Sequence, residues 1–180
     1  MPSIPKRIRY FVAVEGESEQ SFVRWLQYLA DAELHIHLDT YPLGGGGFAS
    51  MLEKTVNEHK KRAGRHGTYK NRFLIIDADR ANSNDWPLDQ LRAEAHTHHI
   101  KVIVQRPNHE GLLYRIISHE VHDIPVANAA QARLRRHWEH YEKPADAAQL
   151  RRHLNFDALI KVADVDPDVE TLLRGIGLIR

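Results

Sequence analysis

The chain has 180 residues, of which 42% are hydrophobic and 27% charged, and its formal net charge is +1 with histidine neutral. This length and composition are typical of one globular domain with a substantial core, and the balanced charge excludes a global field that would attract nucleic acid or a membrane. The chain has no cysteine, which excludes disulfides, thiolate zinc sites and cysteine nucleophiles. No signal peptide or apolar run of about 20 residues is recognised, so we expect a cytoplasmic protein with no membrane partner.

Hydrophobic periodicity predicts strands alternating with helices up to about residue 105. The first elements are a strand at 9–14, a helix from about Ser18, a strand at 34–43, a glycine turn at 44–47, and a helix from Phe48 that ends before Gly64 and Gly67. The next elements are a strand at 73–76, a helix that runs to about His98, and a strand at 101–105. Asp85-Trp86-Pro87 is typical of the cap and first turn of that helix.

After Pro107 the sequence is helical in character, with breaks at Pro125, Pro144 and Pro167. The order predicts an α/β fold: a parallel four-stranded sheet flanked by helices, with a mostly helical C-terminal portion. We expect residues 1–120 to form the α/β core and 121–180 the helical portion, packed together as a single structural unit.

Acidic residues stand where two interior-type strands end. Glu15 follows the first strand, with Glu19 at the start of the next helix, and Asp77 and Asp79 follow the third strand. The carboxyl ends of neighbouring parallel strands lie side by side, at the edge where open α/β sheets bind ligands. Converging carboxylates repel one another unless protons or a cation neutralise them, and Mg²⁺ and Mn²⁺ choose such oxygen ligands.

The same acidic residues also suit ordinary structural roles. A helix N-terminus favours glutamate, which accounts for Glu19 but accounts poorly for Glu15, at the end of a strand. Asp77 could cap the next helix while Asp79 and Arg80 form a turn. Short motifs often occur by chance, but E-G-x-x-E and D-x-D together at two strand ends favour a functional site.

VEGESE after the first strand and IIDADR after the third resemble the signature of the TOPRIM domain, which is shared by topoisomerases, primases and overcoming-lysogenization-defect (OLD) nucleases. Glu19 resembles the OLD-type version. RPNHEGLLYRIISH and HYEKPADAAQLRRHL are similar to the segment after the fourth strand and to the Tyr-x-Lys region of RloB-like proteins. The chain thus resembles RloB-like TOPRIM proteins over most of its length. It departs from them at His109, where a larger aromatic is usual, and in its shorter C-terminal region.

The resemblance implies a TOPRIM-like fold and a metal-dependent nuclease that cleaves RNA, such as tRNA, or DNA, as the effector of an antiphage defence system. The implied cofactor is Mg²⁺ or Mn²⁺, as one or two ions, held by Glu15, Glu19, Asp77, Asp79 and Glu110, with Asn108 beside the last. The implied catalytic residues are Glu15, Asp77, Asp79 and Lys143, the lysine neutralising charge on the scissile phosphate. The implied partners are nucleic acid, a separately encoded ATPase and a second copy of the chain.

For two of these residues the sequence leaves a purely structural role open. Glu110 follows Pro107 and suits the first turn of a helix, and Lys143 before Pro144 suits a solvated helix end. The glycines at 44–47 could cradle a phosphate, but they lack the Lys-Ser/Thr of a P-loop and better suit a flexible turn.

Lysine and arginine gather at 59–72, where a solvated face and a phosphate-binding surface are both open. The nucleic-acid-binding candidates are Lys60, Lys61, Arg65 and, after the D-x-D motif, Arg80. Because the run precedes the third strand, it should lie at the edge opposite Asp77, about 13 Å or more away. It would then reach flanking phosphates of a long nucleic acid, or a partner chain.

Two other functions remain open. A haloacid-dehalogenase-like phosphatase would use Asp77 as nucleophile and Asp79 as acid/base, but that chemistry places D-x-D after the first strand. A non-catalytic TOPRIM-like module could dock on an ATPase, but such a copy usually loses an acidic position, and all four are retained here.

Overall fold

The structure is a computed structural model that describes residues 7–79 and 85–180. Arg80, one of the predicted nucleic-acid contacts, lies outside the described residues. The elements of the first half are β1 (Ile8–Val14), α1 (Glu17–Asp31), β2 (Ile36–Pro42), α2 (Phe48–His66), β3 (Arg72–Asp77) and α3 (Leu88–Thr97). Those that follow are β4 (Lys101–Gln105), α4 (His109–Ser118), α5 (Ala127–His137), α6 (Ala147–His153), α7 (Phe156–Ala163) and α8 (Pro167–Ile176).

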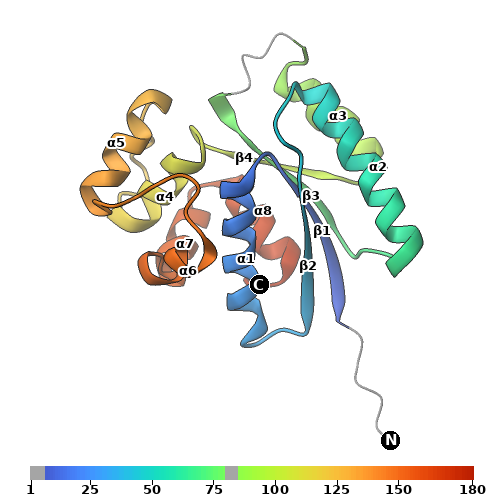
Figure 1. The fold of residues 1–180 in the computed structure, drawn as a ribbon, viewed down its shortest axis with the longest axis horizontal. Helices are drawn as coiled ribbons and strands as arrows, with labels where there is room; N and C mark the ends of the chain where they lie inside the picture. Colours follow the sequence, from blue (N-terminus) through green and yellow to red (C-terminus); the bar gives the residue numbers. More distant parts are fainter. Residues whose placement is uncertain (1–6, 80–84) are drawn as a thin grey trace, which may run out of the picture.

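The strands of the described residues form one parallel sheet of four, in the order β2-β1-β3-β4 (Figure 1). β1 and β3 are the interior pair, and Phe11 of β1 lies beside Arg72 of β3. The last five residues of each of these two strands are buried, which explains their continuous apolar sequences. The predicted α/β class, with a parallel four-stranded sheet and flanking helices, is confirmed.

Helices cover both faces of the sheet. Side chains of β1 alternate between two apolar clusters, with Val12 and Val14 on one face and Phe11 and Ala13 on the other. The first face packs against α1 and the C-terminal helices, and the second against α2 and α3. Figure 1 shows α2 and α3 on one side of the sheet and α1 with α4 to α7 on the other. Trp25 and Trp138 are buried, and Trp86 is half-buried against the second cluster.

The C-terminal portion is tied to the sheet through the start of α8. Asp166 caps this helix and also receives a hydrogen bond from Arg115 of α4, with Nη1–Oδ2 at 2.8 Å, and both side chains are fully buried. Arg106, after β4, pairs with Asp168 at 2.6 Å. A Cβ atom on Gly175 would come within 2.6 Å of the Phe73 ring, so α8 lies close against β3. Buried polar and apolar contacts therefore join the predicted core to the helical portion.

Two local predictions were wrong. α2 continues through Gly64 and ends where Gly67 adopts φ +89, because burial of the helix's apolar face outweighs the weak helix propensity of one glycine. Asp85 does not cap α3: its Oδ2 accepts from Ala49 N at 3.0 Å, in the first turn of α2, and α3 begins after Pro87. No helix of the described residues is long and apolar enough to cross a bilayer.

Candidate active site

Glu15 and Asp77 meet where the neighbouring strands β1 and β3 end. The amide of Asp77 donates to Glu15 Oε2 at 3.3 Å, and the amide of Glu15 donates to the carbonyl of Ile75 at 3.1 Å. Glu15 and Asp77 are each only 8% exposed. The parallel register therefore places the two carboxyls side by side, as the sequence predicted.

Glu19 turns back toward the same strand end. Gly16 is the N-cap of α1, and its amide donates to Glu19 Oε2 at 2.8 Å, so the glutamate closes the first turn on the residue that follows Glu15. The other oxygen, Oε1, lies 4.0 Å from Nδ1 of His109, a ring that is 1% exposed and 3.2 Å from Gln105 Oε1. Glu19 is therefore both a helix cap and a buried carboxylate of the site.

Asp79 and Asn108 lie on the outer side of the site. The amide of Asp79 donates to the carbonyl of Pro107 at 3.0 Å, which attaches the end of β3 to the segment after β4. Asn108 caps α4 by accepting from Gly111 N, and its amide group lies 3.5 Å from Asp79 Oδ2. Asp79 is exposed, in contrast to Asp77, so the two aspartates offer one buried and one solvated carboxylate.

Glu110 is held by two residues of the segment between α5 and α6. Tyr141 donates to Glu110 Oε1 at 3.1 Å, and Lys143 Nζ lies 2.9 Å from the same oxygen. Burial alone would raise the pKa of Glu110, but the hydrogen bond and charge of Lys143 hold that pKa below its ordinary value. Burial and Glu110 together raise the pKa of the Tyr141 hydroxyl, which therefore stays a donor. Glu110 is thus a first-turn glutamate and a side chain of the site at once.

These side chains line one cleft of about 350 Å³ at the carboxyl edge of the sheet. Its lining residues are Glu15, Gly16, Glu17, Ser18, Glu19, Gly44, Gly45, Asp77, Asp79, Asn108, Glu110 and Lys143. Every residue predicted to bind metal or to be catalytic is among them. The cleft brings together the ends of β1 and β3, the starts of α1 and α4, and the segment before α6.

Burial and nearby negative charges disfavour the ionised form of Asp77 in the cleft. Burial, followed by the charges of Glu19, Glu15, Asp79 and Glu110, raises the pKa of Asp77 from an ordinary value of 3.8 to about 9. Its Oδ1 is buried and has no hydrogen-bond partner among the described residues. A buried carboxylate oxygen without a partner raises the free energy of the folded state, and binding of a proton or a cation would lower it.

The donor chemistry of the cleft fits a hard divalent cation. Carboxylates and the side-chain amide of Asn108 line the cleft, and the unpartnered Oδ1 of Asp77 is one of their oxygens. Oxygen ligands of this kind are those that Mg²⁺ and Mn²⁺ prefer. The described part of the chain holds no ready-made group of three His, Asp or Glu side chains placed to bind a metal.

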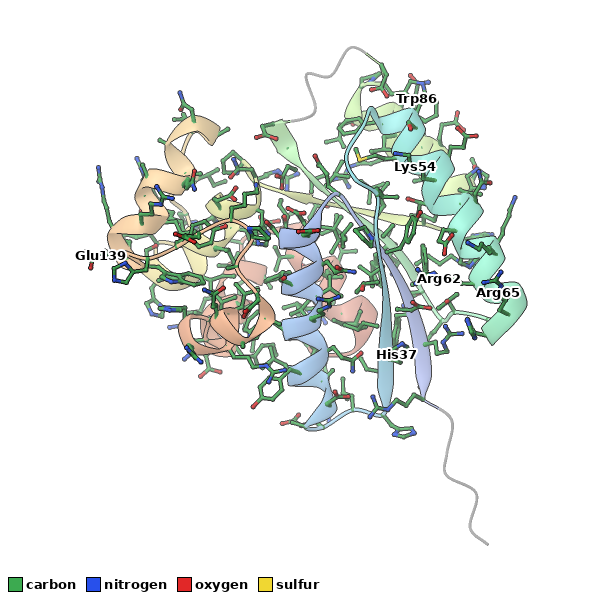
Figure 2. All side chains as sticks on the ribbon, viewed as in Figure 1. His37, Lys54, Arg62, Arg65, Trp86 and Glu139 are labelled. Carbon is green, nitrogen blue, oxygen red and sulfur yellow. The ribbon has the colours of Figure 1, made fainter. Side chains whose placement is uncertain are left out.

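The glycine turn and the basic run take different places. The amides of Gly44 and Gly45 both donate to the carbonyl of Glu15 at 3.1 Å, so they brace the end of β1 and are not available to cradle a phosphate. Figure 2 shows Lys54 near the end of α2 closest to the glycine turn, and Arg65 near the opposite end. Lys60, Lys61 and Arg65 are exposed there, roughly 20 Å along the helix from its start. That position is the one expected for the basic run.

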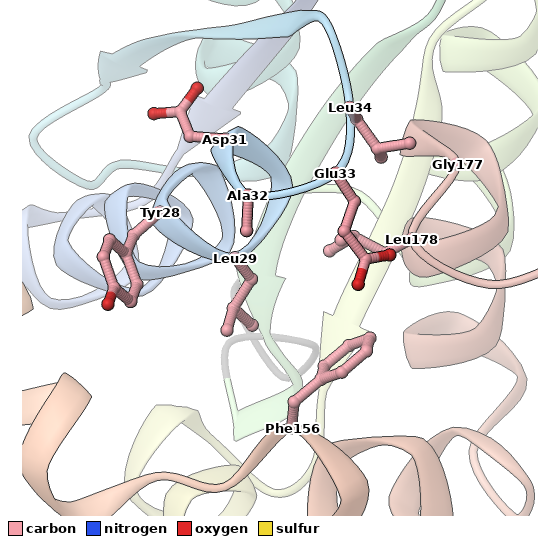
Figure 3. Close-up of a pocket in the computed structure, with 9 residues that line it drawn as sticks. All are labelled: Tyr28, Leu29, Asp31, Ala32, Glu33, Leu34, Phe156, Gly177 and Leu178. Atoms are coloured by element: carbon pink, nitrogen blue, oxygen red, sulfur yellow. The ribbon is translucent and has the colours of Figure 1, made fainter.

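A second hollow, of about 450 Å³, lies at the far end of α1 (Figure 3). It is lined mainly by apolar side chains, among them Leu29, Leu34, Phe156 and Leu178. Its carboxylates are Asp31, which pairs with Arg7 at 3.0 Å, and Glu33. Titratable groups do not converge in it as they do in the cleft, and we assign it no chemistry.

Sequence reasoning assigned no role to Tyr141 or to His109. Tyr141 stood in the Tyr-x-Lys pattern, and its spacing from Lys143 was the available signal, but only the folded chain shows that both reach Glu110. His109 stood out only as a departure from the family pattern, and its burial behind Glu19 gave no sequence signal.

Comparisons of the chain with protein-family models, with curated proteins and with solved structures found no match. Function is therefore inferred from the geometry and charge of the cleft, together with the residues that carry the TOPRIM resemblance.

Proposed function

We propose that this protein is a Mg²⁺- or Mn²⁺-dependent nuclease that hydrolyses phosphodiesters of RNA or DNA in the carboxylate cleft. One observation carries the proposal: Asp77 is buried, has an oxygen without a partner among the described residues, and is surrounded by Glu15, Glu19, Asp79 and Glu110. Such a cluster is neutralised most directly by divalent cations, and a nucleic-acid backbone is a substrate that such cations can bridge to carboxylates.

The metal-binding residues would be Glu15, Glu19, Asp77, Asp79 and Glu110, with Asn108 at the rim. A cation there would supply Lewis acidity to a phosphoryl oxygen and lower the pKa of a water molecule. Asp77 must be ionised to take part, and its proton must leave when a cation binds. Its raised pKa therefore couples cation binding to proton release.

Lys143 supports the phosphate side of the proposal. Its ammonium group is half-exposed at the cleft and bonded to Glu110, so it can approach an anionic substrate while remaining oriented. Burial would lower the pKa of Lys143, but Glu110 raises it, so the side chain stays charged near neutral pH. A fixed positive charge beside the carboxylates would stabilise the charge that develops on the scissile phosphate.

The phosphatase alternative is less well supported. A nucleophilic aspartate must be open to the substrate, whereas Asp77 is only 8% exposed, and the D-x-D motif stands at the end of the third strand, not of the first. A non-catalytic binding module would have no need for the Tyr141–Glu110–Lys143 arrangement, which orients one carboxylate within the cleft.

The test is cleavage of labelled tRNA, single-stranded DNA and duplex DNA by the purified chain, in Mn²⁺ or Mg²⁺ and in EDTA. We expect cleavage of at least one substrate that requires the cation and that Asp77→Asn and Glu15→Gln abolish. Glu53→Gln, which changes an exposed glutamate of α2, is the matched control and should retain full activity. Unchanged cleavage by either cleft variant would refute the nuclease assignment.

A further inference from the structure

A groove of about 470 Å³ lies beside the free edge of β2. Its lining residues are Arg24, Gln27, His37, Leu38, Asp39, Thr40, Ala147 and Arg151. They come from α1, β2 and α6, so the groove crosses the solvent side of α1 between the edge strand and the helical portion. Figure 2 marks His37 on β2 at this edge.

The groove carries positive charge that the protein does not neutralise. Arg24 and Arg151 are both exposed, and within residues 7–79 and 85–180 neither pairs with a carboxylate. Arg151 stacks over the Tyr28 ring at 3.9 Å, which orients its guanidinium group without using its charge. The carboxylate among the lining residues, Asp39, is already paired with Arg9 at 2.7 Å and with Arg62. An anion entering the groove would therefore meet two uncompensated arginines.

The groove and the cleft are lined by neighbouring parts of the same three stretches of the chain. α1 contributes Glu17 to the cleft and Arg24 to the groove, two helical turns or roughly 10 Å further along. The β2 segment contributes Thr40 to the groove and, shortly after, Gly44 to the cleft. The segment that begins α6 likewise contributes Lys143 and then Ala147. Groove and cleft residues are therefore close neighbours along all three stretches of the chain.

The edge of β2 is closed to another strand. Gln27 accepts from the amide of Leu38 at 2.6 Å and donates to the carbonyl of Ile36 at 3.3 Å, and Arg62 donates to the carbonyl of Thr40. Pro42 has no amide hydrogen to offer. Side chains thus occupy the backbone groups that strand pairing would need, which disfavours a second copy of the chain or an extended peptide as occupant.

Building on the proposed nuclease function, we propose that this groove binds the backbone of the polynucleotide next to the scissile phosphate, through Arg24 and Arg151. Arg24 lies roughly 10 Å along α1 from Glu17, and Arg151 stacks on Tyr28, about one helical turn further from the cleft, so the two arginines suit successive phosphates of one strand. The basic run at Lys60, Lys61 and Arg65 lies at the far end of α2 and would be reached only by a longer nucleic acid.

The test is the binding of a fluorescent single-stranded oligonucleotide of about six nucleotides, as RNA and as DNA, in Ca²⁺ across a salt titration. Each lost phosphate contact on a single strand lowers the slope of log affinity against log salt by about 0.7. R24Q/R151Q should therefore lower the slope by about 1.4 and weaken binding. R24K/R151K, which keeps both charges, should keep the slope, and R136Q/K161Q, which removes two exposed charges on α5 and α7, should bind this probe as the wild type does.

Two outcomes would refute binding in this groove: an unchanged slope in R24Q/R151Q, or an equal loss of slope in R136Q/K161Q with the same probe. Because the arginines are exposed, circular dichroism should show that the variants fold normally. Cleavage of the same probe in Mn²⁺ separates this inference from the proposed function. Binding that responds as expected, without cleavage of any substrate, would keep the groove and refute the nuclease.

Discussion

The backbone amide of Asp77 donates to the carboxylate of Glu15 across the β1–β3 pair, at 3.3 Å. This bond joins two residues that are 62 positions apart in the chain, and it fixes the carboxyl of Glu15 at the end of the neighbouring strand. The side-chain oxygen Oδ1 of Asp77 is itself buried without a partner among the described residues. Burial and the neighbouring carboxylates together disfavour the ionised form of Asp77.

Asp77→Asn should stabilise the fold in EDTA, and increasingly so at higher pH. The pKa of Asp77 is raised from 3.8 to about 9, so the native state keeps a proton that the unfolded state loses. Stability from this group is present below about pH 4 and is lost as pH rises toward 9, with a slope of up to about 1.4 kcal/mol per pH unit. Urea unfolding at pH 5 to 9 measures it. Wild-type stability that is flat across that range, or that rises relative to the variant, would contradict the prediction.

Mg²⁺ or Mn²⁺ should oppose the loss of wild-type stability at higher pH. A cation that binds only the folded chain stabilises it by RT ln(1 + [L]/Kd), about 2.7 kcal/mol at one hundred times Kd. We expect the melting temperature of the wild type to rise with cation concentration, more at pH 8 than at pH 6 because protons compete for Asp77. Asp77→Asn should lose most of this rise. Equal shifts in wild type and variant would place the cation elsewhere.

Tyr141→Phe should weaken cation binding by about tenfold to a hundredfold, as expected when a group that orients a metal ligand is lost. The change removes the hydrogen bond to Glu110 Oε1 and keeps the ring packed against Trp138. Calorimetric titration with Mn²⁺ measures the affinity. Tyr28→Phe, at a half-exposed ring outside the cleft, should leave the affinity unchanged.

Lys143→Gln should lower the cleavage rate at saturating cation by about a hundredfold, because a preorganised charge beside the reacting phosphate is lost. Without Lys143 the pKa of Glu110 should also rise, since the lysine is the main group that holds it down against burial. A rate profile against pH would show its acid limb moved to higher pH. Lys161→Gln, at an exposed lysine of α7, is the control and should leave rate and profile unchanged.

Arg115→Met should destabilise the whole chain by about 3–5 kcal/mol, because Asp166 would remain as a buried charge that has lost its closest partner. Arg174→Met breaks an exposed pair with Glu170 and should cost less than about 1 kcal/mol. Urea unfolding followed by tryptophan fluorescence and circular dichroism measures both. Two separate transitions in the wild type would show that the helical portion unfolds independently of the sheet.

Much of the architecture was predictable from local patterns. Continuous apolar runs mark interior parallel strands because both faces of such strands are covered, and this placed β1, β3 and β4 nearly to the residue. The position of Glu15 and Asp77 at two strand ends was predictable for the same reason, since parallel strands end at one edge of the sheet.

Tertiary structure decided what depends on contacts between distant segments. Whether β1 lies next to β3, and so whether Glu15 touches Asp77, follows from strand order, which local periodicity does not encode. The bonds of Tyr141 and Lys143 to Glu110 depend on how the segment before α6 packs over the cleft. Asp85 serves α2 rather than α3 because a side chain caps whichever helix end the fold brings within reach. Which residues could form strands, helices and cleft acids depends on local propensity and burial, so these features are predictable from local sequence. The hydrogen-bond partners of the cleft acids, and their protonation, depend on distances between segments that come together only when the chain folds.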